Sequence, residues 1–459
     1  DVAVTGVQTC ALPIFSVFSV GDRVRETALA RLQREYYSLY AGQTVCEWDP
    51  EISLEGACIV DAVLGAGLHG EPRSPARECI ESINRAQASG STVCAIDVPS
   101  GLVTSVAGQT GQPVHATYTI TFGDPKYGMH TPAGRTLCGR ILCADIFFPP
   151  RPAAESCRRY WYTWDDAERI MPGRPLDAHK GRMGRVLVLA GSHDYPGAAI
   201  MAARGALASG CGLVHLAVPA GIVHRLHGLP PDVILHGLED QGLGILLPET
   251  SAALARIRSS VDSMVIGPGL GRDPRTIQAL GTLIPQVGPG CIVDADALHA
   301  TLAGEYPPDS ILTPHVGEFS ALSGSQTVLS GMRETAAAEW AAAHRVCLVV
   351  KDASTLVVTP GGRMDWITSG HPALARGGSG DVLAGLIGGF VARDLSPDDA
   401  ARLGVWAHGA ASWLAVESGA ENLLAGDLCA AIPRVLGKLA AHSRVWIASE
   451  PAYIHRKGV

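Results

Sequence analysis

Short apolar runs and longer amphipathic runs alternate along most of the chain. Each apolar run has the length and composition of a buried strand and ends in a turn rich in Gly, Asp or Ser. In the first third, such runs occur in "SVFSV", "GACIVDAVLGAGLHG", "STVCAIDVPSGL" and "ATYTITFGDPKYGM". The stretches "VRETALARLQREYYSLYA" and "RECIESINRAQASG" repeat apolar residues at helical spacing. Strands that alternate with helices build parallel βαβ units, so the pattern predicts an α/β protein with doubly wound sheets.

The alternation is interrupted once, by the Pro-rich polar stretch "PPRPAAESCRR". It resumes with "HKGRMGRVLVLAGS" and continues through "VDSMVIGPGLGRD", "CIVDADALHATLAG" and "RVCLVVKDASTLVV". A chain of 459 residues is too long for one ordinary core. We therefore expect a first domain over residues 15–150, a linker over 151–165, a second domain over 166–448 and a tail over 449–459.

The first residues do not fit this pattern. The stretch "VTGVQTCALPI", from Val4 to Ile14, resembles the in-frame translation of a sequencing-library adaptor. We expect residues 1–14 to be an artefact of that kind, and the first domain to be incomplete at its N-terminus.

Composition narrows the class of protein. The formal net charge is −8 and the isoelectric point is near 6.1, so we expect neither a nucleic-acid partner nor a membrane partner. Every apolar run is shorter than the ~20 residues that a transmembrane helix needs. The 12 cysteines are scattered and form no CxxC pair, which indicates reduced thiols. With no recognisable secretory signal, these features predict a cytoplasmic protein.

One stretch predicts an anion site. The sequence "ARGGSGDVLAGLIGGF" places Gly377, Gly378 and Gly380 directly before an apolar helix. Free N–H groups and a partial positive charge at a helix N-terminus bind anions, and glycine lets the backbone approach them closely. Asp381 falls in the first helical turn, where it can act as a general base beside a phosphate or can simply cap the helix.

Other polar residues follow predicted strands, at the end where ligands bind in open α/β sheets. In the second domain these are Lys351 and Thr355 in "KDAST", His315 in "LTPHVGE", and Asp294 and Asp296 in "VDADALH". Each has a structural alternative, such as a hairpin lysine or a helix-capping aspartate.

In the first domain, Asp61, Asp97 and Ser100 follow neighbouring predicted strands. Two carboxylates and a hydroxyl in such positions can coordinate a cation, hold a hydroxyl group of a ligand or cap helices, and spacing alone leaves these alternatives open. The polar strand ends in both halves predict two pockets, one per domain.

The ordered set of motifs resembles a known family. The segments "HKGRMGRVLVLAGS", "GPGLG", "VDADALH", "LTPHVGE", "KDAST" and "ARGGSGDVLAGLIGG" are similar, in this order, to the dehydratase domain of the NAD(P)H-hydrate repair enzymes. The segments "IVDAVLGAGLHG", "AIDVPSGL" and "TFGDPKYG" resemble the companion epimerase domain. No single motif is decisive, but the order is specific and extends over nearly the whole chain from Phe15. The resemblance implies a truncated Rossmann-like doubly wound domain followed by a ribokinase-like α/β domain.

The resemblance also implies an activity. The family repairs NADH and NADPH whose nicotinamide ring has been hydrated, that is, NADHX and NADPHX. The epimerase, an isomerase, interconverts the R and S hydrates, and the dehydratase, a lyase, removes water from the S form. ADP is the implied phosphoryl donor, together with Mg²⁺, and AMP and phosphate are the products. We expect these small molecules as substrates, and a homo-oligomer.

Residue roles follow from the same resemblance. Asp381 is the implied base and a contact of the hydrate. The implied adenine-nucleotide contacts are Lys351, Asp352, Ala353, Ser354, Thr355, Gly378 and Gly380. The implied hydrate contacts of the dehydratase are Ala198, Gly271, His315 and Asp381. Those of the epimerase are Gly65, Ala66, Gly67, Leu68, His69, Gly70, Glu71, Asp97 and Lys126, with Asp61 and Ser100 as potassium ligands.

The chain departs from the family pattern in two places. The family usually has Gly after the lysine of the nucleotide turn, where this chain has Asp352, and a carboxylate there repels phosphates unless it points away. The family's Asn-Asn-Gly-Gly-Asp-Gly loop is missing before the strand near Ser16, so we expect the chain as written to be a poor epimerase.

Two other functions compete with this interpretation. A ribokinase-like scaffold with a GGSGD loop also suits an ATP-dependent kinase of a small vitamin-precursor alcohol, although the fused first domain and the "LTPHVGE" and "GPGLG" segments argue against it. A non-catalytic nucleotide-binding module is the alternative for residues 15–150, because the loop described above is missing there.

Overall fold

The computed structural model describes residues 16–21, 28–41, 44–68, 70–104, 111–146, 158–300, 306–324, 333–419, 422–443, 447 and 450–454. Residues 1–14, which we expect to be adaptor-derived, lie outside the described residues, as do His69 and residues 151–157 of the expected linker. The chain divides into two compact units. The first consists of residues 1–153 and 450–459, and the second of residues 154–449.

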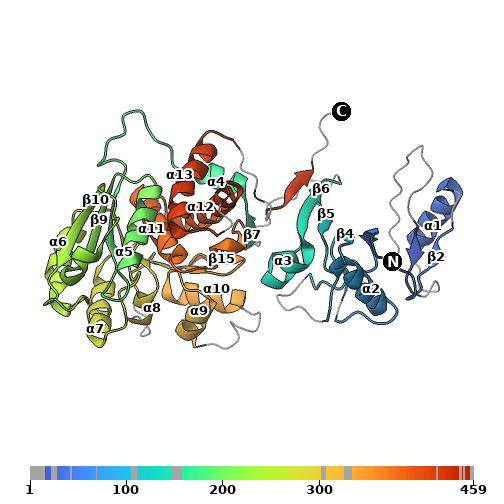
Figure 1. Ribbon diagram of the computed structural model, residues 1–459, viewed down its shortest axis with the longest axis horizontal. Coiled ribbons are helices and arrows are strands. Elements are labelled where there is room, and N and C mark those ends of the chain that lie inside the picture. Colours follow the sequence, from blue (N-terminus) through green and yellow to red (C-terminus); the bar gives the residue numbers. More distant parts are fainter. Residues whose placement is uncertain are drawn as a thin grey trace. The chain divides into compact units, whose positions relative to one another are not determined.

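A five-stranded parallel sheet forms the centre of the first unit (Figure 1). Its strands lie in the order β17 (Ala452–Ile454), β6 (Arg140–Ala144), β5 (Tyr118–Phe122), β4 (Thr92–Ile96) and β3 (Cys58–Asp61). The helices are α1 (Ala28–Ala41), α2 (Ala76–Ala88) and α3 (Pro132–Cys138), with a 3-10 turn η2 (Tyr127–His130), and β1 (Phe18–Ser19) pairs separately with β2 (Cys46–Glu47). Val93 and Ala95 of β4 are fully buried against Ile80 and Ile83 of α2, so the core lies between this helix and the sheet.

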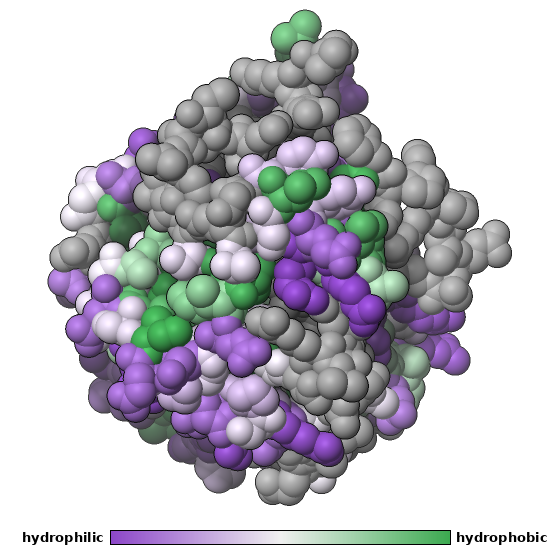
Figure 2. Space-filling model, turned by 90° about the vertical axis from the view of Figure 1, so that its right-hand side faces the viewer, coloured by the Kyte–Doolittle hydropathy of each residue, from purple (hydrophilic) through white to green (hydrophobic). Residues whose placement is uncertain are grey.

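Helix α1 carries a row of exposed apolar side chains, namely Leu29, Leu32, Tyr36, Leu39 and Tyr40. Leu39 and Tyr40 are each 73 % exposed, whereas Ala30 and Tyr37 of the same helix are buried. Figure 2 shows apolar residues scattered among hydrophilic ones on the face of the molecule that it views. Most of the apolar surface of α1 therefore lies outside the core of the first unit.

The second unit contains a ten-stranded mixed sheet. Its order is β10 (Val233–Leu238), β9 (Leu213–Pro219), β8 (Arg185–Leu189), β11 (Ser263–Ile266), β12 (Ile292–Val293), β13 (Ile311–Leu312), β14 (Cys347–Val350), β15 (Thr355–Val358), β16 (Met364–Ile367) and β7 (Arg159–Tyr162). The strands from β10 to β14 are parallel, and β15 is antiparallel to both of its neighbours. The ends of the parallel strands therefore meet along one edge of this sheet, where the polar motifs follow them.

The helices of the second unit are α4 (Trp164–Ile170), α5 (Pro196–Ala208), α6 (Ser251–Arg258), α7 (Pro274–Leu283), α8 (Asp296–Ala300), α9 (Val316–Ser323), α10 (Arg333–His344), α11 (Ser379–Ala392), α12 (Pro397–Glu417) and α13 (Ala425–Ala440). Short 3-10 turns are η3 (Ala220–Arg225), η4 (Pro248–Thr250), η5 (Ile284–Gln286) and η7 (Pro372–Leu374). In the part of the chain that the structure describes, none of the helices combines the length and the apolar character needed to cross a bilayer.

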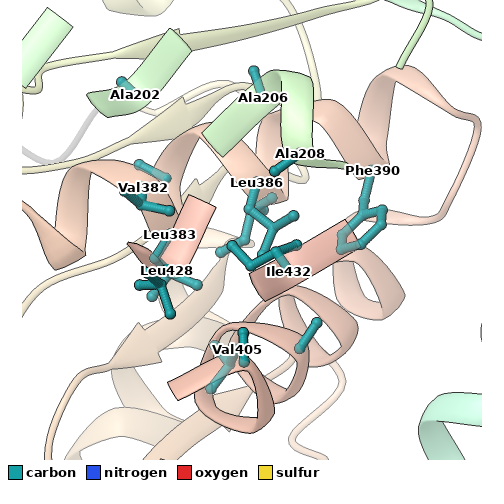
Figure 3. Packing of buried hydrophobic residues seen from close by; sticks show 14 of the residues in the cluster. Ala202, Ala206, Ala208, Val382, Leu383, Leu386, Phe390, Val405, Leu428 and Ile432 are labelled. Atoms are coloured by element: carbon teal, nitrogen blue, oxygen red, sulfur yellow. The ribbon is translucent and has the colours of Figure 1, made fainter. Parts of the chain in front are cut away.

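Helices α5 and α11 pack very closely. A Cβ atom added to Gly205 of α5 would lie 2.1 Å from the carbonyl oxygen of Val382, and one added to Gly385 of α11 would lie 1.9 Å from that of Ala202. Glycine is required at both positions because the two backbones touch there. Figure 3 shows the surrounding core, formed by Ala202, Ala206, Ala208, Val382, Leu383, Leu386, Phe390, Val405, Leu428 and Ile432. This core holds the N-terminus of α11, with its Gly-rich loop, in a fixed position.

The structure confirms the predicted α/β class and differs from the expectations in three details. The parallel pattern ends at β14, because the connection to β15 is a short hairpin turn that allows only antiparallel pairing. Strand β7 lies within residues 151–165, where we expected a linker. Residues 449–459, expected to be a tail, contain β17, which pairs with β6.

Candidate functional site

Polar residues from three successive strand ends of the second unit meet beside the N-terminus of α11. Asp294 follows β12, Thr313 follows β13 and Lys351 follows β14. The Nζ atom of Lys351 donates a hydrogen bond of 2.9 Å to Oδ1 of Asp294, and the hydroxyl of Thr313 donates one of 2.7 Å to the same oxygen. Burial disfavours the charge of Lys351, but the carboxylates of Asp294, Glu318 and Asp381 outweigh it and raise the pKa of the lysine. Lys351 therefore stays a cation inside the site.

Asp381 faces this ion pair from the first turn of α11. Burial, together with the neighbouring carboxylates of Asp294 and Asp296, raises the pKa of Asp381 to about 7, although Lys351 opposes the shift. A carboxyl group with such a pKa is close to half protonated at neutral pH, so it can both accept and release a proton there. This is the property that a general base at this position needs.

The Gly-rich loop turns sharply into α11. Gly378, the residue that caps the helix, has a φ of 90°, and no side chain caps this N-terminus among the described residues. The hydroxyl of Ser379 donates to the carbonyl groups of Leu374 and Arg376, which closes the loop on itself. A Cβ on Gly380 would lie 3.5 Å from the Nζ atom of Lys351, so the loop and the lysine face the same space. Helix N–H groups and an ammonium group directed to one point form an anion site.

His408 of α12 holds this loop through a hydrogen bond. Its Nε2 atom lies 2.9 Å from the carbonyl oxygen of Ser379, and since a carbonyl only accepts, Nε2 carries the hydrogen. Burial lowers the pKa of His408 to about 4, so the ring is neutral at physiological pH. Sequence reasoning missed His408, because a single histidine in the apolar run "GVWAHGAASWLAV" carries no signal of its own.

Residues 351–355, at the turn from β14 into β15, are five of the seven residues to which the resemblance assigns the nucleotide. The carboxylate of Asp352 accepts from Nη1 of Arg333 at 2.5 Å and from the backbone N–H of Ala353 at 2.7 Å. The hydroxyl of Thr355 donates to the carbonyl of Asp352 and closes the turn. Asp352 is therefore neutralised by a cation of its own, and Arg333, at the start of α10, is a partner of the turn that sequence reasoning missed.

The residues expected to contact the hydrate lie along the same edge of the sheet. A Cβ on Gly269 would lie 2.6 Å from that of Ala198, so the "GPGLG" turn rests on the start of α5. Gly271 has a φ of 79°, and its N–H donates to Oδ2 of Asp296. Ser192 is 4 % exposed, its hydroxyl has no partner among the described residues, and its oxygen lies 3.6 Å from the Cβ position of Gly271. Ser192 is a further polar group that the motifs did not indicate.

His315 has a structural role as well. It precedes α9, and its Nδ1 atom accepts hydrogen bonds from the N–H groups of Gly317 and Glu318, while the Glu318 carboxylate accepts from the N–H of His315. The ring is 60 % exposed and forms an N-terminal cap with Nδ1 unprotonated. The Nε2 atom lies 3.5 Å from Oε1 of Glu318, so the contacts of this histidine fit the capping role, and its contact with the hydrate stays a prediction.

In the first unit, Asp61 and Ser100 meet at the ends of β3 and β4. The Ser100 hydroxyl donates to Oδ1 of Asp61 at 2.5 Å, and its backbone N–H donates to Oδ2 at 2.8 Å. Both residues are fully buried. Burial raises the pKa of Asp61, and the hydrogen bonds from Ser100 and Val63 oppose the rise. The cluster, which also includes the carbonyl of Leu64, consists of oxygen atoms, the donor type that a potassium ion accepts.

Asp97 and Lys126 form a second cluster in this unit. Lys126 donates to the carboxylate of Asp97 and, at 2.9 Å, to the hydroxyl of Thr121. Asp97 has a φ of 66°, an unusual conformation for a non-glycine residue that often marks a functional position. The described residues of the turn 65–71 follow β3, and Thr104 binds the carbonyl of Ala66, so the predicted first-unit residues collect at neighbouring strand ends.

A cavity of about 550 Å³ lies elsewhere in the second unit, between β9, β10 and α6. His215, His236 and Arg256 are among its lining residues, and the two imidazole rings are hydrogen-bonded at 3.0 Å. None of the residues predicted to be functional lines this cavity.

Comparisons with known proteins agree with this arrangement. The family model described as NAD(P)H-hydrate dehydratase matches residues 186–434, and the model described as YjeF-related protein N-terminus matches residues 4–128. The bifunctional NAD(P)H-hydrate repair enzyme Nnr of Moorella thermoacetica is 36 % identical over 390 residues, which are 83 % of this chain and 73 % of that protein.

Solved structures agree as well. The ADP/ATP-dependent NAD(P)H-hydrate dehydratase of Bacillus subtilis, co-crystallised with ATP and Mg²⁺, is 30 % identical with a TM-score of 0.52, and the match covers 61 % of this chain and 98 % of that one. A ribokinase-like superfamily protein of Enterococcus faecalis shares the fold, with 24 % identity, a TM-score of 0.54 and coverage of 64 % and 99 %.

These matches confirm the predicted pair of domains, with a ribokinase-like second domain, and do not favour the reading as a vitamin-precursor kinase. The chain belongs to the family of bifunctional NAD(P)H-hydrate repair enzymes.

Proposed function

We propose that the second unit dehydrates (S)-NADHX and (S)-NADPHX with ADP as phosphoryl donor, and that the first unit is the one that interconverts the R and S hydrates, although poorly in the chain as written. The observation that carries the proposal is the position of Asp381, whose pKa is raised to about 7 and which stands between an uncapped helix N-terminus and the Lys351–Asp294 pair. A proton acceptor next to an anion site is what phosphorylation of a ring hydroxyl requires.

The proposed reaction uses these groups in two stages. The ring hydroxyl of the hydrate attacks the terminal phosphorus of ADP, its proton passes to the carboxylate of Asp381, and AMP leaves. The N–H groups before α11 and the ammonium of Lys351 stabilise the charge on the transferring phosphoryl group. The phosphorylated oxygen is a better leaving group than hydroxide. Its departure as phosphate, with loss of a proton from the neighbouring ring carbon, restores the ring double bond.

The metal ions are proposed on the chemistry of the donors present. Among the described residues, no cluster of three or more His, Cys, Asp or Glu side chains can hold a metal ion. Mg²⁺ fits as a companion of the nucleotide phosphates, because it keeps several waters and needs few protein ligands. In the first unit, the oxygens of Asp61 and Ser100 would hold potassium, which would replace the hydrogen bond between them. The cytoplasmic location and the homo-oligomer stay predictions.

The first test measures recovery of the absorbance band of reduced nicotinamide. Purified protein is incubated with (S)-NADHX and Mg²⁺, with ADP or ATP in parallel. We expect recovery with ADP, and loss of more than about 100-fold in rate for Asp381→Ala, because a general base contributes on this scale. Asp399→Ala is a matched control, since Asp399 is also an acidic residue in the first turn of a helix, α12. Absence of recovery with either nucleotide, from folded protein, would contradict the proposal.

The same assay started from (R)-NADHX tests the first unit, because NADH then forms only after epimerisation. We expect the chain as written to recover reduced nicotinamide little faster than the uncatalysed epimerisation allows, and efficient recovery would refute that expectation. Loss of any such recovery in Asp97→Ala, with S-hydrate repair unchanged, would place the isomerase activity at the Asp97–Lys126 cluster.

A further inference from the structure

Arg333, the first residue of α10, makes an unusual set of contacts with the turn between β14 and β15. Its Nη1 atom donates to Oδ2 of Asp352 at 2.5 Å, and its Nη2 atom donates to the carbonyl oxygen of Ser354 at 2.9 Å. Its guanidinium carbon lies 4.7 Å from the centre of the Trp366 ring on β16. One buried side chain therefore connects a helix, a turn and a strand.

The burial of this pair is asymmetric. The side chain of Arg333 is 6 % exposed, whereas that of Asp352 is 32 % exposed. A buried guanidinium needs both a counter-charge and hydrogen-bond acceptors, and it obtains them from Asp352 and Ser354. The Asp352 carboxylate, in turn, is directed into the protein, towards the arginine.

Asp352 directly follows Lys351, which faces the Gly-rich loop. An unpaired carboxylate at this position would repel the phosphates of a nucleotide and would also compete with them for the lysine. The contacts of Arg333 remove both effects, because they neutralise the carboxylate and hold the turn in one conformation.

We propose that Arg333 is a positioning residue for nucleotide binding, and that it makes the acidic residue Asp352 compatible with a phosphate site. The inference rests on the proposed function, since it assumes that the turn 351–355 contacts an adenine nucleotide. Arg333 touches neither the hydrate nor the reacting atoms in this account. Its effect is on affinity for the nucleotide.

Binding of ADP and of ATP to the full chain, measured by calorimetry at low and high salt, tests the proposal. We expect Arg333→Met to weaken binding by about tenfold or more, as for the loss of a hydrogen bond between charged groups. Since repulsion by the unpaired Asp352 is screened by salt, the penalty should shrink at high ionic strength. In the repair assay, the KM for the nucleotide should rise while kcat changes little. The double variant Arg333→Met/Asp352→Asn, which has no unpaired charge, should recover most of the affinity.

Arg169→Met is the control, because Arg169 forms an exposed ion pair with Asp166 on α4 in the same unit. Arg333→Lys, which keeps the charge but not the two-pronged geometry, should bind with intermediate affinity. It also serves as the test if the methionine variant does not fold. The inference alone would be overturned by wild-type affinity in a folded Arg333→Met or Arg333→Lys variant. It would also be overturned by a loss of affinity that is independent of salt and is not recovered in the double variant. Failure of the wild-type chain to bind either nucleotide would overturn the proposed function together with it.

Discussion

Asp381 owes its chemistry to the residues around it. An aspartate in water ionises near pH 4, whereas burial, Asp294 and Asp296 bring the pKa of this one to about 7. Lys351 limits the rise in this pKa, so that part of the carboxyl group is still ionised at neutral pH. A group tuned in this way exchanges protons readily, but above pH 7 it also leaves a poorly solvated negative charge in the folded protein.

This environment predicts a pH dependence of both rate and stability. The dehydration rate should rise as the pH increases through about 7 and then level off, since the base must be deprotonated. Because the folded-state pKa lies above the unfolded value, the folded protein binds more protons between the two values, and the free energy of unfolding falls as the pH rises through that window.

Asp381→Asn should therefore abolish the activity and yet stabilise the protein at pH 8, by a few kcal/mol at most. At pH 5, where Asp381 is protonated in the folded state, the gain should be much smaller. Thermal unfolding of wild type and variant at the two pH values measures this, and an equal difference at both would refute the assignment of the shift to Asp381.

At the scale of single residues, motifs predicted some of the site and could not predict the rest. Lys351, Gly380 and Asp381 stand next to strand and helix ends that the pattern marks, and the structure brings them together. Arg333 stands 19 residues before its partner Asp352, at the start of a helix without any motif. Only the folded chain shows that this arginine compensates for an acidic residue that looked unfavourable.

At the scale of elements, the close contact between α5 and α11 decides where the Gly-rich loop lies. The two helices approach until backbone atoms touch at Gly205 and Gly385. Any displacement of α11 along or away from α5 would move Asp381, one turn from Gly385, relative to Lys351. Packing far inside the core therefore contributes to the geometry of the site.

Gly385→Ala tests this connection. The added Cβ would lie 1.9 Å from the carbonyl oxygen of Ala202, so the helices must separate, and we expect a loss of about 1–3 kcal/mol in the free energy of unfolding. The folded fraction of Gly385→Ala should also have a lower dehydratase rate than the wild type.

Gly437→Ala on α13 is the matched control, because its Cβ would meet nothing within 4 Å. It should leave activity unchanged and stability equal or higher by up to about 1 kcal/mol. Urea unfolding measures the free energy of unfolding of both variants, and similar values would contradict the role given to the α5–α11 contact.

Periodicity predicted the type of most elements, but not all of their pairings. The helices at 28–41, 76–88 and 379–392 lie where apolar residues recur at helical spacing. Strand β13, in contrast, is two residues long, and α9 begins after three intervening residues, at Val316, capped by His315. Such short elements are stabilised by the neighbouring strands and helices, and a local pattern cannot show this.

At the scale of the whole molecule, the chain passes from the first unit into the second and then returns. Residues 452–454 add β17 to the edge of the first sheet beside β6, in parallel register from Ala452 opposite Leu142 to Ile454 opposite Ala144. Residues 452–454 therefore contribute to the stability of the first unit.

Deletion of residues 450–459 should lower the unfolding temperature of the first unit and leave that of the second unchanged, because β6 becomes an unpaired edge strand. Differential scanning calorimetry should resolve the two transitions. Deletion of residues 455–459 alone, which keeps β17, is the control and should change neither transition. A lower transition temperature for the second unit instead would contradict the pairing.

The return of the chain also constrains how the two activities can be separated or recombined. Residues 154–449 form an insertion between two neighbouring strands of one sheet, rather than a module attached to its end. A single cut between residues 153 and 154 therefore yields one fragment that lacks an edge strand and another that carries this strand without its sheet. Replacement of residues 154–449 by another second unit, with the flanking strands β6 and β17 retained, would exchange the dehydratase and keep the first unit whole.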